Sequence, residues 1–186
     1  MKARDIPNII TVLRILLVIP IMVLLARQEY RTVLVLFAVA GFSDGVDGFL
    51  ARRFDWRTPL GAILDPLADK FMLIGVYLVL GWSGLVPFWL MLLVILRDVI
   101  IISGATAYRR LCGDLTMEPT LISKANTLLQ ILLGLAVIIG AAGWELPPWT
   151  ILGMIAVVTL STVWSGVDYV WQWGRRAREC HARERK

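Results

Sequence analysis

The chain has 186 residues, of which 58% are hydrophobic and 18% are charged, and its formal net charge is +5. Together with a mean hydropathy of +0.74, this composition excludes an ordinary water-soluble domain and indicates a protein of the lipid bilayer. The net positive charge does not indicate a nucleic-acid partner, because the cations lie between apolar stretches and near the C-terminus, where membrane topology places them.

Six apolar stretches are long enough to cross a bilayer, since about 20 helical residues span about 30 Å of hydrocarbon. In chain order they cover residues 9–26, 32–50, 60–81, 87–108, 121–142 and 148–173. We therefore predict an all-α, polytopic membrane protein with six transmembrane helices. No linker or internal repeat divides the sequence, so one domain over residues 1–186 is the simplest organisation.

Charge between the stretches predicts the orientation. Nearly all loop and terminal Lys and Arg fall on the side of the N-terminus, and only Arg27 and Arg31 fall on the other. Cytoplasmic loops carry this excess, so both termini are expected in the cytoplasm. Arg14 interrupts the first stretch and no cleavage site follows it, which favours a retained helix over a signal peptide. The compact chain without a transit peptide favours a bacterial inner membrane.

Four aspartates in the second and third stretches are the most informative residues. Asp44 and Asp47 are three residues apart, and Asp65 and Asp69 are four apart, so each pair lies on one helical face. A carboxylate in hydrocarbon costs several kcal/mol, about 3 on insertion scales, so four in two neighbouring helices predict a functional site. Carboxylate oxygens at this density suit hard divalent cations, and we predict Mg²⁺ or Mn²⁺.

The surroundings of these acids favour a site open to the cytoplasm. Asp44 precedes Arg52 by eight residues, which is roughly 12 Å of helix. Gly48 and Gly61 lie beside the acids, and Ala51 extends this small-residue strip, so that a ligand or backbone can approach closely. Arg52 provides a donor fork for phosphate.

Intramembrane acids can also serve in ion pairs or in ion transport. Interhelical ion pairs with Arg14, Lys70 or Arg97 would account for one or two acids but not for four. A cation- or proton-coupled transporter also has intramembrane acids, but such sites usually lie near the midplane between inverted repeats. The acids here are predicted toward one face and no repeat is evident, so an enzyme is favoured. A purely structural role is the weakest alternative.

The segment from Gly41 to Lys70 contains D-x-x-D-G-x-x-A-R, eight further residues, and G-x-x-x-D-x-x-x-D. This pattern resembles the signature of the CDP-alcohol phosphotransferases, and all its fixed positions match. They are Asp44, Asp47, Gly48, Ala51, Arg52, Gly61, Asp65 and Asp69. The opening IPNIITVLR is similar to the start of bacterial phosphatidylglycerophosphate synthases and eukaryote-type cardiolipin synthases.

The resemblance implies a donor site with two divalent metals. All four aspartates would ligate the metals, and Asp69 would also be the catalytic base. CDP would be bound around Asp44, Gly48, Ala51, Arg52 and Gly61. CDP-diacylglycerol would be the donor, and the family also suggests a homodimer among membrane lipids.

The acceptor alcohol is predicted from the sequences of the fourth and fifth predicted helices. The stretches LRDVIIISGATAYRR and MEPTLISKANTLLQ resemble eukaryote-type cardiolipin synthases, because position 98 is Asp instead of Glu and position 126 is Asn instead of Lys. Phosphatidylglycerol is therefore the predicted acceptor, and glycerol-3-phosphate is the runner-up. The candidate acceptor residues are Arg97, Ser123, Lys124, Asn126 and Gln130.

Some of these candidates form a polar stripe with Thr127 on the fifth helix, at i, i+3, i+4 and i+7 from Ser123. The stripe either receives a glycerol head group or makes ordinary interhelical hydrogen bonds. Lys124, at the expected cytosolic mouth, either attracts anionic lipid or follows the charge rule.

Overall fold

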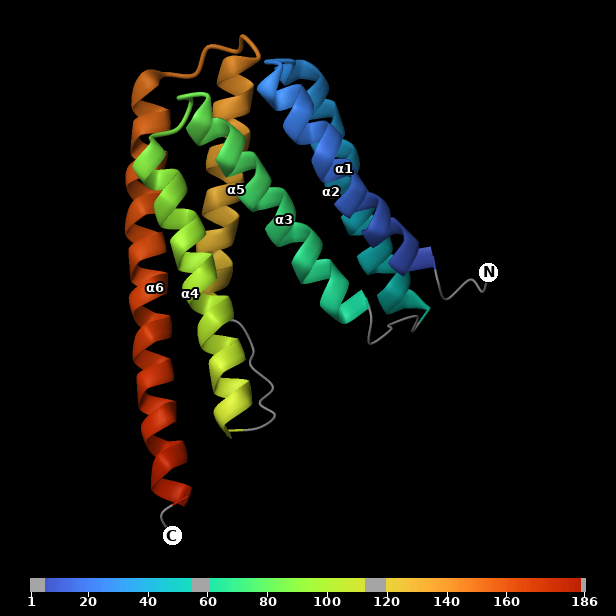
Figure 1. Cartoon of the computed structure of the whole chain (residues 1–186). Helices are drawn as coiled ribbons and strands as arrows, with labels where there is room; N and C mark the ends of the chain where they lie inside the picture. The colour runs from blue at the N-terminus through green and yellow to red at the C-terminus, as the bar shows by residue number, and fades with distance from the viewer. Residues whose placement is uncertain (1–5, 55–60, 113–119, 185–186) are drawn as a thin grey trace. The chain divides into compact units, whose positions relative to one another are not determined.

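The structure is a computed structural model that describes residues 6–54, 61–112 and 120–184. Within the helices, some side chains fall outside this description, at residues 6–8, 47–52, 62, 63, 66, 105, 107–112, 173, 174 and 176–184. The described backbone is helical with short turns (Figure 1). Its helices are α1 (Ile6–Ala26), α2 (Tyr30–Arg53), α3 (Gly61–Trp82), α4 (Phe88–Cys112), α5 (Leu121–Ala141) and α6 (Pro148–Glu184).

The six helices confirm the predicted all-α class over the described ranges. Three of them contain stretches long and apolar enough to cross a membrane: Ile9–Ala26, Leu121–Ala141 and Pro148–Gln172. That all six cross the bilayer, with both ends in the cytoplasm, stays a prediction. The helix α6 continues to Glu184, beyond the predicted apolar span that ends at residue 173.

The turns between helices use left-handed backbone conformations. Gln28 has φ of 63°, and the N–H of Glu29 donates to the carbonyl of Leu24 at 2.9 Å, which closes the end of α1. Gly84 and Gly143 have φ of 73° and 98° after α3 and α5. A side chain is strained in this region, so glycine suits both positions. Pro148 then starts α6, where its missing N–H has no intrahelical partner to lose.

The chain forms two compact units, and the division passes through α5. Unit 1 is Met1–Val86 with Gly134–Leu146, and unit 2 is Pro87–Leu133 with Pro147–Lys186. In unit 1, α1 packs against both α2 and α3 (Figure 1). The side chains of Ile21, Leu25 and Tyr77 are fully buried there. A Cβ atom on Gly75 would lie 2.7 Å from the Met22 sulfur, so this glycine permits the close contact of α3 with α1.

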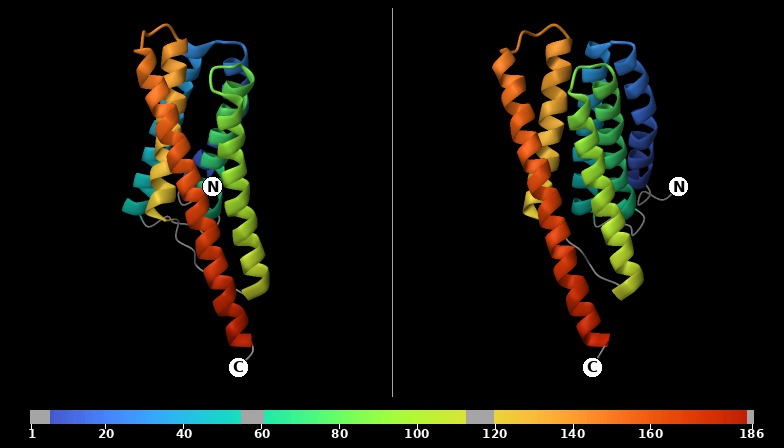
Figure 2. Two further views of the ribbon diagram at one scale, coloured as in Figure 1. Left: turned by 90° about the vertical axis from the view of Figure 1, so that its left-hand side faces the viewer. Right: turned by 60° about the vertical axis from the view of Figure 1, so that its left-hand side comes forward.

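In unit 2, α4 packs along α6, and Figure 2 shows the two helices side by side. The packed faces contain apolar residues such as Leu90, Val94 and Val158. Helices α4, α5 and α6 also contribute several fully or nearly buried polar residues to unit 2, namely Arg97, Asp98, Ser123, Asn126, Gln130, Thr162 and Ser165. Buried polar groups in an apolar environment must be hydrogen-bonded to one another. The interior of unit 2 therefore contains more polar side chains than the apolar sequence of its helices predicts.

Candidate active site

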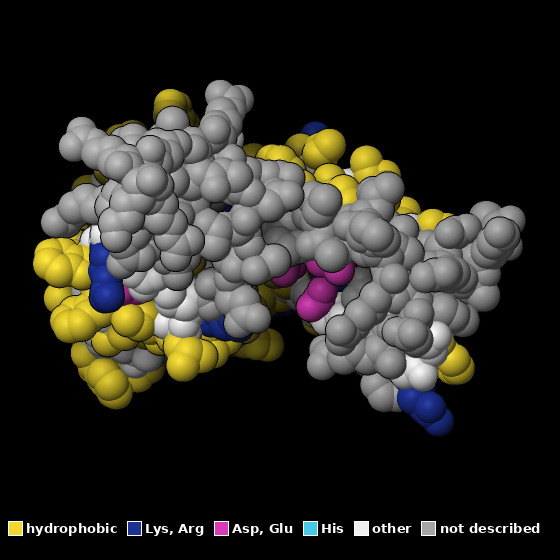
Figure 3. Space-filling model, turned by 90° about the horizontal axis from the view of Figure 1, so that it is seen from below, with side chains coloured by type: hydrophobic (Ala, Val, Ile, Leu, Met, Phe, Trp, Pro, Cys, Tyr) yellow, Lys and Arg dark blue, Asp and Glu magenta, His cyan; other side chains and the backbone are white. Residues whose placement is uncertain are grey.

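The end of α2 and the beginning of α3 place the described aspartates of unit 1 near one another. Asp44 lies in the last three turns of α2, and Asp65 and Asp69 lie in the first three turns of α3. The charges of Asp44 and Asp65 are close enough to repel that of Asp69. Seen from below, acidic side chains are grouped at the surface (Figure 3). Asp44 of α2 thus lies near Asp69 of α3, while convergence of all four acids on one metal site stays a prediction.

Helix α1 supplies hydrogen-bond donors to this group, which we call the acidic cluster (Asp44, Asp65 and Asp69). The hydroxyl of Thr11 donates to Oδ1 of Asp65 at 2.6 Å. The Nη1 atom of Arg14 lies 2.5 Å from Oδ1 of Asp44 and 3.4 Å from Oδ1 of Asp69. Residues three apart share a helical face, so α1 presents both donors to α2 and α3.

Exposure differs sharply between the acidic cluster and the arginine that contacts it. The side chain of Arg14 is 3% exposed, whereas those of Asp44 and Asp69 are 54% and 58% exposed. The acids are therefore open on the side away from Arg14 and have lone pairs available for another ligand. A buried guanidinium alone cannot account for carboxylates that remain more than half exposed.

The donor chemistry of the cluster fits hard divalent cations. Three carboxylates repel one another unless cations or protons intervene, and the guanidinium of Arg14 demonstrates that two of them accept a cation. Among the residues whose positions are described, no three acidic, His or Cys side chains converge on a single point suitable for an ion. The side chain of Asp47, the fourth predicted ligand, lies outside that set.

The predicted CDP-binding residues are only partly described. Gly61 is buried at the first position of α3. Gly48, Ala51 and Arg52 lie in the last turns of α2, but their side-chain surroundings fall outside the described part of the structure.

The predicted acceptor residues lie in unit 2 on α4 and α5. Among them, Arg97 has a side chain that is 4% exposed. Its Nη1 donates to Oδ1 of Asp98 at 2.6 Å. Its Nη2 donates to the hydroxyls of Ser123 at 2.6 Å and Ser165 at 2.8 Å. The ring of Tyr169 lies 6.0 Å from the guanidinium carbon. Arg97 thus joins α4 to α5 and α6.

The polar stripe of α5 faces α6. Asn126 Oδ1 accepts hydrogen bonds from Ser161 at 2.7 Å and Thr162 at 3.0 Å. Gln130 Nε2 donates to the hydroxyl of Thr162 at 3.2 Å. These bonds are interhelical hydrogen bonds, which is one of the two roles predicted for the polar stripe. Within the described residues, Nδ2 of Asn126 is buried without an acceptor, whereas Lys124 is exposed.

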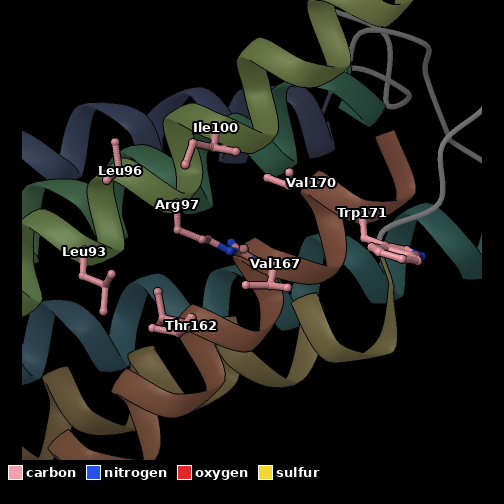
Figure 4. Close-up of a pocket in the computed structure, with 10 residues that line it drawn as sticks. Leu93, Leu96, Arg97, Ile100, Thr162, Val167, Val170 and Trp171 are labelled. Atoms are coloured by element: carbon pink, nitrogen blue, oxygen red, sulfur yellow. The ribbon is translucent and has the colours of Figure 1, made fainter. Parts of the chain in front are cut away.

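An apolar groove between α4 and α6 has a volume of about 590 Å³. Figure 4 shows Arg97 extending from α4 into the space beside Thr162 and Val167 of α6. The remaining wall is largely apolar and includes Leu93, Leu96, Ile100, Val163, Val170 and Trp171. The groove thus combines a hydrocarbon-like wall with one buried cation.

Two features of these sites were not predicted from the sequence. The first is the contact of Thr11 with the acids, although its place three residues before Arg14 on an apolar helix was a usable signal. The second is the role of Thr162 and Ser165 of α6, because isolated hydroxyl residues are common in transmembrane helices and carry little information singly.

Three helices of the described chain are long and apolar enough to cross a membrane, and half-exposed acids lie on two others, α2 and α3. Together these features define a helical membrane protein with an acidic polar site. A sequence model of one family, CDP-alcohol phosphatidyltransferase, matches residues 4–164, and the chain belongs to this family.

Curated relatives agree with this assignment. The chain is similar to human cardiolipin synthase (CMP-forming), with 35% identity over 144 residues, which is 69% of this chain and 48% of the relative. A cardiolipin synthase (CMP-forming) of Streptomyces coelicolor is 30% identical over 186 residues, or 95% of this chain and 86% of the relative. A CDP-diacylglycerol–glycerol-3-phosphate 3-phosphatidyltransferase of Pseudomonas fluorescens is 44% identical over 104 residues, or 52% of each. The chain spans about half the length of its human and rat relatives.

Proposed function

We propose that this protein transfers a phosphatidyl group from CDP-diacylglycerol to the hydroxyl of phosphatidylglycerol, forming cardiolipin and releasing CMP. The acidic cluster on α2 and α3 supports this proposal most directly, because half-exposed acids in an apolar protein require a cationic or phosphate-handling role. The family match over residues 4–164 supports a role for that cluster in phosphoryl transfer.

The donor half of the reaction takes place at the four aspartates. Asp44, Asp47, Asp65 and Asp69 would hold two divalent cations, Mg²⁺ or Mn²⁺, which neutralise the donor diphosphate and stabilise the charge on departing CMP. Gly48, Ala51, Arg52 and Gly61, together with Asp44, bind the CDP portion. Gly48, Ala51 and Gly61 are small and leave room for the nucleotide, and the Arg52 fork donates to phosphate.

Asp69 acts as the base. Its carboxylate is exposed beside the other acids and accepts the proton of the acceptor hydroxyl as that oxygen attacks the phosphorus that carries the diacylglycerol. The new phosphodiester bond forms while the bond from this phosphorus to the CMP oxygen breaks, so CMP leaves with the electron pair. A metal-bound carboxylate is a weak base, and placement next to the attacking oxygen therefore matters more than basicity.

The acceptor half is proposed for unit 2. Arg97 lines an apolar groove of about 590 Å³ and is the buried cation suited to an anionic lipid. Ser123, Asn126 and Gln130 position the elements around it through their bonds to Arg97 and α6. Asn126 also has a buried Nδ2 donor without an acceptor in the described residues. Lys124 attracts the anionic lipid from the surface.

The membrane arrangement follows from the same proposal. All six helices cross a bacterial inner membrane, both termini are cytoplasmic, the active site faces the cytoplasm, and the protein is a homodimer. Cysteine accessibility from each side of sealed vesicles checks the topology. Cys112 and Cys180 are first replaced by Ser, because both lie on the predicted cytoplasmic side. Labelling of a Gln28→Cys variant in that background from the cytoplasmic side would contradict the topology.

The test uses purified protein in micelles with labelled CDP-diacylglycerol, Mn²⁺ and either phosphatidylglycerol or glycerol-3-phosphate. We expect cardiolipin and CMP with phosphatidylglycerol. Asp69→Asn is expected to reduce turnover at least about 100-fold, within the usual contribution of a general base. Asp168→Asn is a matched control, because Asp168 lies on α6 and, among the described residues, bonds within its own helix to Gln172. Equal loss in both variants would contradict a specific role for Asp69.

The Pseudomonas relative favours a second acceptor, glycerol-3-phosphate, with the same donor site. Product from glycerol-3-phosphate alone would replace the cardiolipin proposal with this one. Cation flux across liposomes without CMP release would instead favour a transporter.

A further inference from the structure

Arg14 is a buried cation in an apolar helix, and its position requires explanation. Its residue is 2% exposed, and a buried charge of this kind is costly unless it is paired. Its partners Asp44 and Asp69 come from two different helices. One guanidinium on α1 therefore links α2 to α3 at the acidic cluster.

The contacts use atoms that a divalent cation would also need. A single Arg14 nitrogen, Nη1, contacts Oδ1 of Asp44 and Oδ1 of Asp69. A divalent cation held by Asp44 and Asp69 would compete with the guanidinium for these carboxylates. Since like charges repel, the positive charge of Arg14 also opposes the arrival of a divalent cation.

Arg14 has room to leave the carboxylates. It lines an apolar groove of about 510 Å³ between α1 and α2, together with residues such as Leu17, Val39 and Ser43. The flexible arginine stem can lie along such a surface while its charged end moves. A displaced guanidinium would remain beside the cluster and keep its positive charge there.

We propose that Arg14 is a built-in counter-ion of the acidic cluster, which holds Asp44 and Asp69 together in the metal-free protein and is displaced when divalent cations bind. This inference rests on the proposed metal site. With four carboxylates and two divalent cations the site is neutral, so Arg14 leaves it with one net positive charge. That charge favours the anionic diphosphate of the donor. Arg14 is thus a positioning residue that lowers metal affinity and raises donor affinity.

The first experiment measures Mn²⁺ binding to purified protein in micelles by following the electron paramagnetic resonance signal of free Mn²⁺. We expect Arg14→Met to bind Mn²⁺ about tenfold more tightly than wild type. Because Asp44 and Asp69 remain more than half exposed, they tolerate the loss of their partner. Arg31→Gln is the control, since Arg31 is exposed and, within the described residues, donates to the carbonyl of Ala142 in the same unit. It is expected to leave Mn²⁺ affinity unchanged.

Equal or weaker Mn²⁺ binding by Arg14→Met would overturn the counter-ion role, because an arginine that only supports the fold cannot oppose the metal. If wild type binds no Mn²⁺, the proposed metal site itself is wrong, and the two failures are thereby distinguished. With Mn²⁺ at saturation, the same variant is expected to bind CDP-diacylglycerol several-fold more weakly than wild type.

A second experiment needs no variant, so it stands even if Arg14→Met does not fold. Wild-type protein is treated with the arginine reagent phenylglyoxal at increasing Mn²⁺, and modification is quantified by peptide mass spectrometry. We expect modification of Arg14 to rise several-fold with Mn²⁺ while that of Arg31 stays constant. Modification of Arg14 that stays constant or falls as Mn²⁺ binds would contradict displacement.

Discussion

The buried pair of Arg97 and Asp98 gives the sharpest prediction about stability. Their side chains are 4% and 2% exposed, and Nη1 lies 2.6 Å from Oδ1. Asp98→Asn leaves the guanidinium buried without a counter-charge. Breaking a buried pair in this way usually costs roughly 3–5 kcal/mol. We expect about 3 kcal/mol, because the hydroxyls of Ser123 and Ser165 still accept hydrogen bonds from Arg97.

Thermal unfolding in micelles measures this effect. For a chain of this size, about 3 kcal/mol corresponds to a fall in Tm of roughly 6–12 °C. Replacing both partners by apolar residues, in Arg97→Met with Asp98→Leu, is expected to restore most of the loss, since no charge is then buried alone. Asp168→Asn serves as the control and is expected to shift Tm by no more than about 1 °C, as is usual for substitutions outside the core.

Two results would refute the reasoning. If Asp98→Asn unfolds at the wild-type temperature, the pair does not neutralise a buried charge. If the double variant is as unstable as the single one, the loss comes from packing and not from charge. The double variant also tests the proposed acceptor role of Arg97, which predicts a higher KM for phosphatidylglycerol and an unchanged KM for CDP-diacylglycerol.

Three further substitutions test individual contacts by thermal unfolding. Thr11→Val removes the hydrogen bond to Asp65 and is expected to cost about 1.5 kcal/mol, the lower end for bonds to charged groups; an equal loss in the exposed Thr32→Val would contradict it. Gly75→Ala is expected to cost about 1 kcal/mol, because the new Cβ would meet the flexible Met22 side chain at 2.7 Å. Gly134→Ala, whose Cβ would meet Val76 at 3.8 Å, should cost clearly less. Asn126→Leu is expected to cost about 1 kcal/mol, since Ser161 keeps the carbonyl of Val158 as an acceptor, and an unchanged Tm would show that the α5–α6 bonds are dispensable.

The helices were predictable because length and hydropathy alone determine them in a membrane protein. Predicted limits such as 121–142 differ by a residue from the observed Leu121–Ala141. The end of α6 was not predictable from hydropathy, because its last residues before Glu184 are charged and form helix for reasons of local propensity.

Contacts between helices were much harder to predict. In a soluble protein an apolar stripe identifies the buried face, but in a bilayer the face toward lipid is apolar as well. The apolar residues of α1 therefore do not show which face contacts the acids, and the spacing of Thr11 and Arg14 was the available signal. The spacing of Asp65 and Asp69 did indicate a shared face, because charged residues avoid lipid whatever the packing. The polar stripe through Asn126 likewise identified one face of α5 but not the helix that this face contacts.

Exposure separates two kinds of polar residue in this chain. In unit 2, Arg97, Asp98 and Gln130 are almost completely buried. Arg97 and Gln130 bond to neighbouring helices, and Asp98 pairs with Arg97 on α4. Such groups stabilise the fold, since leaving any one of them unpaired in an apolar interior would cost energy. In unit 1, Asp44 and Asp69 stay more than half exposed beside a buried arginine. Stability alone would favour burying and fully pairing these acids or replacing them by apolar residues, so their persistence as open carboxylates is better explained by ligand binding.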